Sequence, residues 1–337
     1  MSEEIKVITS VDEITTAEWS DLVQSSSVAS WFQTREAFEF FDGPSFLDAF
    51  CVAVKNNGLL KGLVVGYIQK DGGKLKQFFS RRAIINGGPL LADDITEQEL
   101  GALLSAVKVF LKRKAIYIET RNFNDYGRWR VKFEKCGFDY EPHLNFHVDT
   151  TSIDTINQNM TKNRKRDIRV SFRDGAKIIE NPTKKQIEDF YIILSDLYNN
   201  KIKTPLYPLS FFEELNKQST AIILLVEYNE KIIGGTVCVV LKDTTVYEWF
   251  VCGMDDIDVK TIFPSEVATY AGLKYSTENG CKVFDMMGAG VPDVHYGVRD
   301  FKAKFGGQLV EYGRFRYVCN PFLFKLGTFG VKILKKL

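Results

Sequence analysis

The chain has 337 residues, of which 45% are hydrophobic and 26% are charged, and its formal net charge is +1. This length suffices for two domains of ordinary size, and this composition supports buried cores. A net charge this small excludes a protein that holds nucleic acid through overall positive charge, so any attraction for phosphate must come from local clusters.

Cysteine and histidine spacing indicates no metal or disulfide framework. The six cysteines are at least fourteen residues apart, and the histidines are His143, His147 and His295. We therefore expect reduced thiols, no metal site and no bound cofactor. The start of the sequence lacks the apolar run of a signal peptide, and no window approaches the ~20 apolar residues that span a bilayer. These features predict a cytoplasmic protein.

The first half of the chain predicts a mixture of helices and strands. Thr96 and Glu99 form the pattern of a capping box, which marks the start of a helix. The predicted helices are 12–24, 31–41, 96–114 and 126–135. The predicted strands are 49–55, 60–69, 74–79, 115–119 and 138–148.

The second half repeats this plan after a helix at 153–173. Further helices begin at Thr183 and Pro208, and others are predicted at 264–278 and 297–305. The predicted strands are 176–180, 221–228, 231–241, 244–252, 281–286 and 308–318.

The two halves match in order and in spacing. The helix starts at 96 and 264 differ by 168, and the strand starts at 115 and 281 differ by 166. Three meandering strands, then a helix, a strand, a helix and a strand, is the order of the acetyltransferase-type (GNAT) fold. We predict an α/β (α+β) protein of two tandem GNAT-like domains with mixed twisted sheets flanked by helices. The domains are predicted at 1–150 and 151–320, with a C-terminal tail at 321–337.

The segment 284–307 is the best candidate for a reaction centre. It predicts a buried strand, a Gly-rich turn and a short helix that ends at a double glycine. Phe301 and Phe305 lie one turn apart, whereas Arg299 and Lys302 lie elsewhere on the helix circumference. Fixed positive charge beside a strand end suits a reaction that builds negative charge on an oxygen.

Two neighbouring loops bear on the chemistry. His295 and the nearby Asp293 are candidate general bases, with a satisfied loop histidine as the alternative for His295. After the strand at 244–252, the acidic run at 255–258 would repel a pyrophosphate. This run counts against simple CoA binding in the second domain.

The helix predicted at 153–173 carries a row of cations. Lys162, Arg166, Arg169 and Arg173 fall at i, i+4, i+7 and i+11, so they share one stripe. Arginines in a row suit bidentate contacts with phosphate, either a diphosphate or an RNA backbone. A solvated helix face is the alternative.

The tail at 321–337 is apolar, with four lysines and no acidic residue. It is too short to span a bilayer. It is typical of an amphipathic segment on an anionic membrane surface, and equally of a C-terminal helix docked on the core.

Four motifs resemble the FemAB-like peptidyltransferases, a family of tandem GNAT-fold acyltransferases. The motifs are Trp31-Phe32-Gln33-Thr34, the helix segment 163–169, Tyr247-Glu248-Trp249 followed by Gly253, and Phe301-Lys302 followed by Phe305-Gly306-Gly307. The resemblance implies that Lys302 and Phe301 lie at the reaction centre and that Arg166 helps to hold phosphates. Further candidate substrate-binding residues are Lys162, Arg169, Tyr247, Trp249 and Arg299.

The resemblance implies transfer of an aminoacyl group from aminoacyl-tRNA to an amine of a peptidoglycan or other cell-envelope precursor. The chain lacks the long heptad-patterned insertion of several members. An alternative is an acyl-CoA-dependent N-acetyltransferase that acts on an amino sugar in polysaccharide biosynthesis. A second alternative is a non-catalytic module that binds the precursor or RNA. The expected location is the cytoplasm, with peripheral contact at the inner face of the cell membrane.

Overall fold

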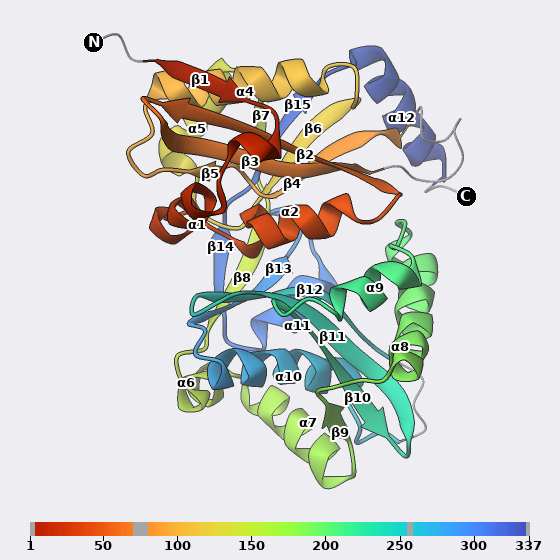
Figure 1. Cartoon of the computed structure of the whole chain (residues 1–337). Coiled ribbons are helices and arrows are strands. Elements are labelled where there is room, and N and C mark those ends of the chain that lie inside the picture. The colour runs from red at the N-terminus through yellow and green to blue at the C-terminus, as the bar shows by residue number, and fades with distance from the viewer. Residues whose placement is uncertain (1–3, 70–79, 255–258, 335–337) are drawn as a thin grey trace. The chain divides into compact units, whose positions relative to one another are not determined.

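The computed structural model describes residues 4–69, 80–254 and 259–334 (Figure 1). It divides into two compact units, Met1–His143 with Glu311–Leu337, and Leu144–Val310. Each unit has its own mixed sheet with helices packed against it, so the predicted α/β class is confirmed. No described helix combines the length and the hydropathy needed to cross a bilayer.

The sheet of the first unit has the strand order β1-β2-β3-β4-β6-β15-β7, and β5 pairs with β3. Its one parallel pair among the described ladders is β4 with β6. The strands are β1 (Ile5–Ile8), β2 (Leu47–Asn56), β3 (Leu59–Gln69), β4 (Arg82–Gly87), β5 (Leu90–Leu91), β6 (Tyr117–Asn122), β7 (Asp139–Glu141) and β15 (Arg314–Val318).

Helix starts in the first unit follow their capping residues. Thr34 accepts a hydrogen bond from the amide of Ala37, so the predicted helix at 31–41 is a short 3₁₀ turn followed by α2. The predicted capping box of Thr96 and Glu99 is present and opens α4. The helices are α1 (Thr16–Ser25), α2 (Arg35–Asp42), α4 (Glu97–Leu111), α5 (Arg130–Lys135) and α12 (Pro321–Leu334), and the 3₁₀ turns are Val11–Glu13, Trp31–Gln33 and Gly127–Trp129.

The sheet of the second unit has the order β14-β8-β13-β12-β11-β10-β9. The strands are β8 (Leu144–Asp149), β9 (Lys177–Ile179), β10 (Ala221–Tyr228), β11 (Lys231–Leu241), β12 (Thr245–Gly253), β13 (Val283–Gly288) and β14 (Gln308–Glu311). The helices are α6 (Ile153–Asn159), α7 (Lys162–Arg173), α8 (Lys184–Leu197), α9 (Leu209–Leu215), α10 (Pro264–Glu278) and α11 (Gly297–Ala303), and a π-helical turn at Tyr198–Ile202 follows α8.

Helices α8 and α10 cover opposite faces of this sheet, as the surroundings of two adjacent residues of β11 show. A Cβ atom at Gly234 would lie 3.2 Å from Pro264 of α10, and one at Gly235 would lie 3.1 Å from Phe190 of α8. Successive strand residues point to opposite faces. The second sheet is therefore buried on both sides, which agrees with its long apolar strands.

Two predicted strands each divide into two. The strand predicted at 138–148 forms β7, which pairs with β15, and β8, which pairs with β13 in the other sheet. The strand predicted at 308–318 likewise forms β14 and β15, which are separated at Gly313, where φ is +62°. Because these segments change sheets, the predicted boundaries at 150 and 320 do not coincide with those of the compact units.

The helix predicted at 153–173 is interrupted. Met160 has extended backbone angles (φ −66°, ψ 139°), and the side chain of Thr161 caps the start of α7. The cation stripe therefore lies on α7 alone. The strand predicted at 74–79 and the acidic run at 255–258 lie outside the described residues.

Candidate functional site

The parallel strands β12 and β13 separate part-way along their length. They pair only from Thr245 with Val283 to Tyr247 with Asp285, although β12 continues to Gly253 and β13 to Gly288. In the first unit, β4 and β6 stay paired over six positions, up to Gly87 with Asn122. Beyond Tyr247 and Asp285, main-chain groups at the facing strand edges are not used by the β12–β13 ladder, so they need other hydrogen-bond partners.

Lys302 of α11 lies at this separation. Its Nζ donates hydrogen bonds to the main-chain carbonyls of Met286, of Met287 (3.4 Å) and of Gly288 (2.9 Å). Met287 has a φ of +55°, which reorients the end of β13. Only 7% of Lys302 is exposed. Burial lowers the pKa of its ammonium group, while the nearby carboxyls of Glu248 and Asp285 act in the opposite direction.

Glu248 of β12 is buried beside this lysine. Burial raises the pKa of its carboxyl to about 7, while the charge of Lys302 lowers it. Its Oε1 accepts a hydrogen bond from Thr236 Oγ1 at 3.4 Å. Within the described chain, Glu248 Oε2 and Thr269 Oγ1 lack a hydrogen-bond partner of normal geometry. The site therefore holds a buried acid whose hydrogen-bonding capacity is only partly used.

Asp285 and His147 support the end of β13. His147 Nε2 lies 3.2 Å from Asp285 Oδ2, and the two residues are direct partners in the β13–β8 ladder. Asp285 Oδ1 accepts a hydrogen bond from the amide of Met287 at 2.6 Å. Asp285 thereby holds Met287 in the conformation that presents its carbonyl to Lys302.

Sequence reasoning did not single out Glu248, Asp285 or His147 as members of the site. Glu248 and Asp285 are each the one acidic residue of an otherwise apolar strand. Burying a charge is costly, so such a residue is the available sequence signal. The sequence around His147 gives no comparable signal, because only the strand register places His147 opposite Asp285.

Phe301 packs against a buried arginine. The Arg164 guanidinium lies 4.5 Å and 4.6 Å from the ring centroids of Phe301 and Phe305, and it forms an ion pair with Glu266 of α10. Phe301 and Lys302 are adjacent in sequence, but Phe301 contacts α7 whereas Lys302 contacts β13. The structure therefore gives Phe301 a packing contact that the resemblance did not anticipate.

Arg299 and His295 lie in and before α11. Arg299 Nε donates to the carbonyl of Ala289 at 2.9 Å, and its guanidinium also contacts the carbonyl of Val291. These contacts close the turn after β13. The side chain of His295 is 89% exposed, and its Nε2 lies 3.3 Å from Asp300 Oδ2. Asp293 has a φ of +60° and belongs to the same turn region.

Tyr247 and Trp249 face different surroundings. Tyr247 is buried, and burial raises the pKa of its hydroxyl. Trp249 is the extra residue of an irregularity in the β11–β12 ladder, where Cys238 pairs with Glu248 and Val237 pairs with Phe250. The Trp249 ring is 5.4 Å from that of Phe211 in α9. Trp249 therefore belongs to an aromatic cluster with α9.

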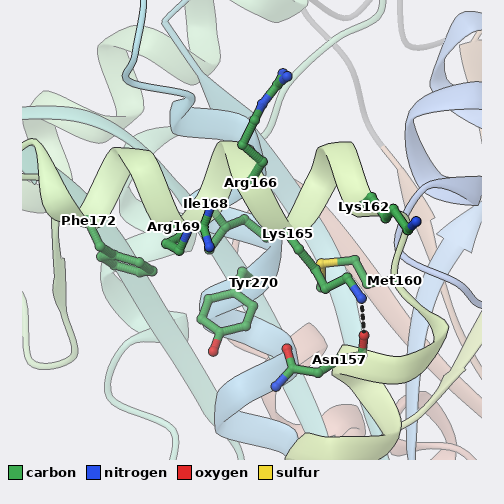
Figure 2. A pocket seen from close by; sticks show the side chains of 9 residues that line it. All are labelled: Asn157, Met160, Lys162, Lys165, Arg166, Ile168, Arg169, Phe172 and Tyr270. Carbon is green, nitrogen blue, oxygen red and sulfur yellow. Dashed lines mark hydrogen bonds between the residues drawn. The ribbon is translucent and has the colours of Figure 1, made fainter.

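The cations of α7 line a pocket of about 580 Å³ (Figure 2). The lining residues are Asn157, Met160, Lys162, Lys165, Arg166, Ile168, Arg169, Phe172 and Tyr270. Lys165 Nζ donates to the carbonyl of Asn157 at 2.8 Å. Figure 2 shows the side chain of Arg166 projecting away from Tyr270, and it pairs with Asp167 at 2.8 Å. Arg173 pairs with Asp174 and does not line this pocket.

Helix α7 thus has two faces with different contacts. Arg164 faces α10 and α11, whereas Lys162, Lys165 and Arg169 border the pocket. The corner before α7 also touches the end of α11, because the amide of Thr161 donates to the carbonyl of Lys304 at 3.0 Å. The pocket and Lys302 are therefore connected through α7 and α11.

A family comparison covers this part of the chain. Residues 212–332 match the model of the FemAB family, and this range includes β12, β13, α11 and Lys302. Members of this family and of the GNAT acyltransferases are generally enzymes. No curated protein matches the chain.

Three solved structures show the fold. The crystal structure of FemX has a TM-score of 0.71 and 15% identity over 95% of this chain and 99% of that chain. A tandem GNAT protein from the clavulanic acid biosynthesis pathway has a TM-score of 0.62 and 11% identity over 94% and 99%. The structure of L-PGS from Bacillus licheniformis has a TM-score of 0.52 and 14% identity over 80% and 85%. The predicted tandem GNAT-like fold is confirmed.

Proposed function

We propose that this protein is an N-acyltransferase of the FemAB-like type. It transfers an aminoacyl group from aminoacyl-tRNA to an amine of a peptidoglycan or other cell-envelope precursor. The observation that carries this proposal is the position of Lys302, a buried cation on the carbonyls of residues 286–288, where β12 and β13 separate within a FemAB family domain.

The chemistry follows from that position. The acceptor amine attacks the ester carbon of the donor, a C–N bond forms, and the C–O bond to the leaving hydroxyl breaks. Negative charge develops on oxygen in the tetrahedral intermediate. A preorganised ammonium group in a site shielded from water stabilises that charge, and one such group typically contributes ~10²–10³ in rate.

The cations of α7 suit the phosphates of a substrate. Lys162, Arg166 and Arg169 border a pocket whose floor includes the apolar groups of Met160, Ile168 and Phe172. Charge-assisted hydrogen bonds to phosphate are about twice as strong as neutral ones. A phosphate-bearing precursor that also presents apolar surface matches this lining (Figure 2).

The C-terminal helix supports a peripheral membrane contact from the cytoplasmic side. Phe324 of α12 packs on Tyr117, with ring centroids 5.4 Å apart, whereas Phe322 is 71% and Leu326 is 44% exposed. Residues 321–337 include four lysines and no acidic residue. Apolar side chains flanked by lysines suit an anionic lipid surface.

A second candidate function is acyl-CoA-dependent N-acetylation of an amino sugar in polysaccharide biosynthesis. The likeness to the tandem GNAT protein from the clavulanic acid biosynthesis pathway, whose structure is one without AcCoA, favours it. A third is a non-catalytic module for the precursor or RNA, which the α7 pocket favours.

One paired assay separates these functions. Purified protein is incubated either with labelled aminoacyl-tRNA and a nucleotide-linked peptidoglycan precursor, or with labelled acetyl-CoA and amino-sugar nucleotides. We expect transfer from aminoacyl-tRNA. Transfer from acetyl-CoA alone would establish the second function. No transfer from either donor, together with RNA binding that weakens steeply with salt, would establish the third.

A further inference from the structure

We propose that Glu248 and Lys302 form a coupled acid–base pair, in which Glu248 takes the proton of the attacking amine and Lys302 protonates the leaving group. This inference deepens the proposed acyl transfer and rests on it. It supplies the general base that sequence motifs did not identify, since His295 is exposed and pairs with Asp300.

The two side chains converge on one point of the fold. Glu248 is the first residue of β12 beyond the last β12–β13 pair, Tyr247 with Asp285. The carbonyls that hold Lys302 belong to Met286, Met287 and Gly288, which follow Asp285 on the neighbouring strand. Both groups therefore lie where the strands separate.

A purely structural ion pair fits the contacts poorly. A buried pair that stabilises a fold needs close contact and satisfied hydrogen bonds. In the part of the chain that the structure describes, Glu248 and Lys302 form no direct ion pair, and Glu248 Oε2 has no hydrogen-bond partner of normal geometry. The Thr269 hydroxyl also acts on this carboxyl and lowers its pKa, but a carboxylate oxygen can accept more than one hydrogen bond, so Glu248 retains capacity for a substrate N–H group.

The surroundings of Glu248 and Lys302 bring the pKa values of the two groups closer together. Burial raises the pKa of Glu248 to about 7 and lowers that of Lys302 below its usual value. A base with a pKa near the working pH is the most effective in proton transfer. The charged or titratable groups around Glu248 are Lys302 on α11, Asp285 on β13, His147 on β8, Cys238 on β11 and Tyr247 on β12.

The bonds and protons of this step balance with no further reactant. The amine nitrogen forms a bond to the acyl carbon, and its proton passes to the Glu248 carboxylate. The bond from carbon to the leaving oxygen breaks, and Lys302 donates a proton to that oxygen. Glu248 then releases its proton to the solvent, and the neutral amine of Lys302 takes one proton from the solvent. The pair is restored, and one acceptor proton has moved to the leaving alcohol.

The first test measures the coupling and needs no substrate. Glutamate Cδ atoms are labelled with ¹³C, and the Glu248 signal is assigned as the one missing from Glu248→Gln. We expect its midpoint near pH 7, and a rise of about one pH unit or more in Lys302→Met, because a nearby cation lowers the pKa of a carboxyl. A midpoint in the ordinary glutamate range, or one that Lys302→Met leaves unchanged, overturns the coupling.

The second test measures turnover. Glu248→Gln keeps the side-chain shape but cannot take the proton, so we expect kcat to fall about 10²–10⁴-fold with KM nearly unchanged. The acid limb of the pH–rate profile should disappear, and Glu248→Asp should restore part of the rate. Adding Lys302→Met to Glu248→Gln should cost little more than the worse single change, because residues that act as a unit are non-additive.

The controls separate this inference from the proposed function. Glu278→Gln makes the same substitution at the exposed end of α10 and should leave both readouts at the wild-type value. Wild-type turnover in Glu248→Gln, with a normal melting temperature, overturns the catalytic role. If the wild-type chain transfers no acyl group from either donor, the proposed function and the proton transfers fail together, whereas the titration still reports the coupling.

Discussion

Lys302 Nζ donates a hydrogen bond of 2.9 Å to the main-chain carbonyl of Gly288, the last residue of β13. This contact connects α11 to the strand end where β12 has already separated. The Asp285 side chain accepts a hydrogen bond from the amide of Met287, which lies between Asp285 and Gly288. The carbonyls that Lys302 contacts are therefore positioned by Asp285 as well as by Lys302. The cation is thus preorganised, and its position needs no rearrangement when charge develops on a substrate.

Replacing Lys302 by methionine should remove this stabilisation. We expect kcat to fall ~10²–10³-fold with the protein still folded, measured by single-turnover transfer alongside circular dichroism. Lys304→Met is the matched control, because Lys304 is exposed at the end of the same helix. Near-normal turnover of Lys302→Met with the true substrates would contradict the assignment.

The α7 pocket should account for phosphate binding. Lys162→Gln with Arg169→Gln removes two cations of the lining. Each charge-assisted hydrogen bond contributes about 1.5–3 kcal/mol, so we expect at least a tenfold loss of affinity for inorganic pyrophosphate and for UDP by titration calorimetry. Arg173→Gln on the same helix pairs with Asp174 outside the pocket and should leave the affinity unchanged. An equal loss in both variants would show a diffuse charge effect instead.

Arg164 should matter for stability far more than its neighbours on α7. Its side chain is 2% exposed and contacts Glu266, Phe301 and Phe305. Removing one partner of a buried ion pair typically costs 3–5 kcal/mol, so we expect a loss of about that size for Arg164→Ala in denaturant unfolding. Arg166→Ala, at a side chain that is 59% exposed, should change stability by no more than about 0.5 kcal/mol. Similar losses for the two variants would refute the buried role.

Glu119 of β6 should make the protein sensitive to acid. Burial opposes its ionisation, but Arg121, Arg314 and Arg316 lower its pKa from 4.5 to about 2. The folded state therefore binds this proton less tightly than the unfolded state. The stabilisation is complete above pH 4.5 and is lost as the pH falls toward 2, and it amounts to about 3 kcal/mol. Unfolding curves against pH should lose this component in Glu119→Gln, and a parallel acid dependence in the variant would contradict it.

The C-terminal helix should bind anionic membranes. We expect the wild-type chain to co-sediment with phosphatidylglycerol vesicles but not with phosphatidylcholine vesicles, and binding to weaken as salt rises. Phe322→Ser with Leu326→Ser should reduce the bound fraction several-fold, because both side chains are exposed. Val109→Ser, at a 77% exposed position of α4, is the control. Equal binding to both lipids would contradict the proposal.

Local sequence signals predicted most elements of the fold. The capping boxes at Thr96 and Thr183 mark the true starts of α4 and α8, because a cap satisfies amides that the helix itself leaves unpaired. The spacing of cations on α7 predicted that Lys162, Arg166 and Arg169 would share one stripe of the helix, and all three line the pocket. The apolar floor of that pocket required the packing of Tyr270, on α10, beside Phe172.

Only some residues of the candidate site could be predicted from the sequence. Lys302 could be selected from its motif and helix position, because both are local. His147 and Asp285 are 138 residues apart, and they meet only because β8 and β13 pair in one particular register. A shift of one residue would send these side chains to the other face of the sheet. Sequence spacing cannot report such a register.

The sequence by itself determined the helices, the strands and the repeated plan, because caps, turns and periodicity act between near neighbours, and it singled out Lys302 as a candidate. The tertiary structure alone decided that residues 144–149 join the second sheet and that residues 314–318 join the first. It also decided that Glu248 lies buried beside Lys302. The proton affinity of a buried acid depends on the desolvation and the charges that surround it, and long-range strand pairing brings those groups together.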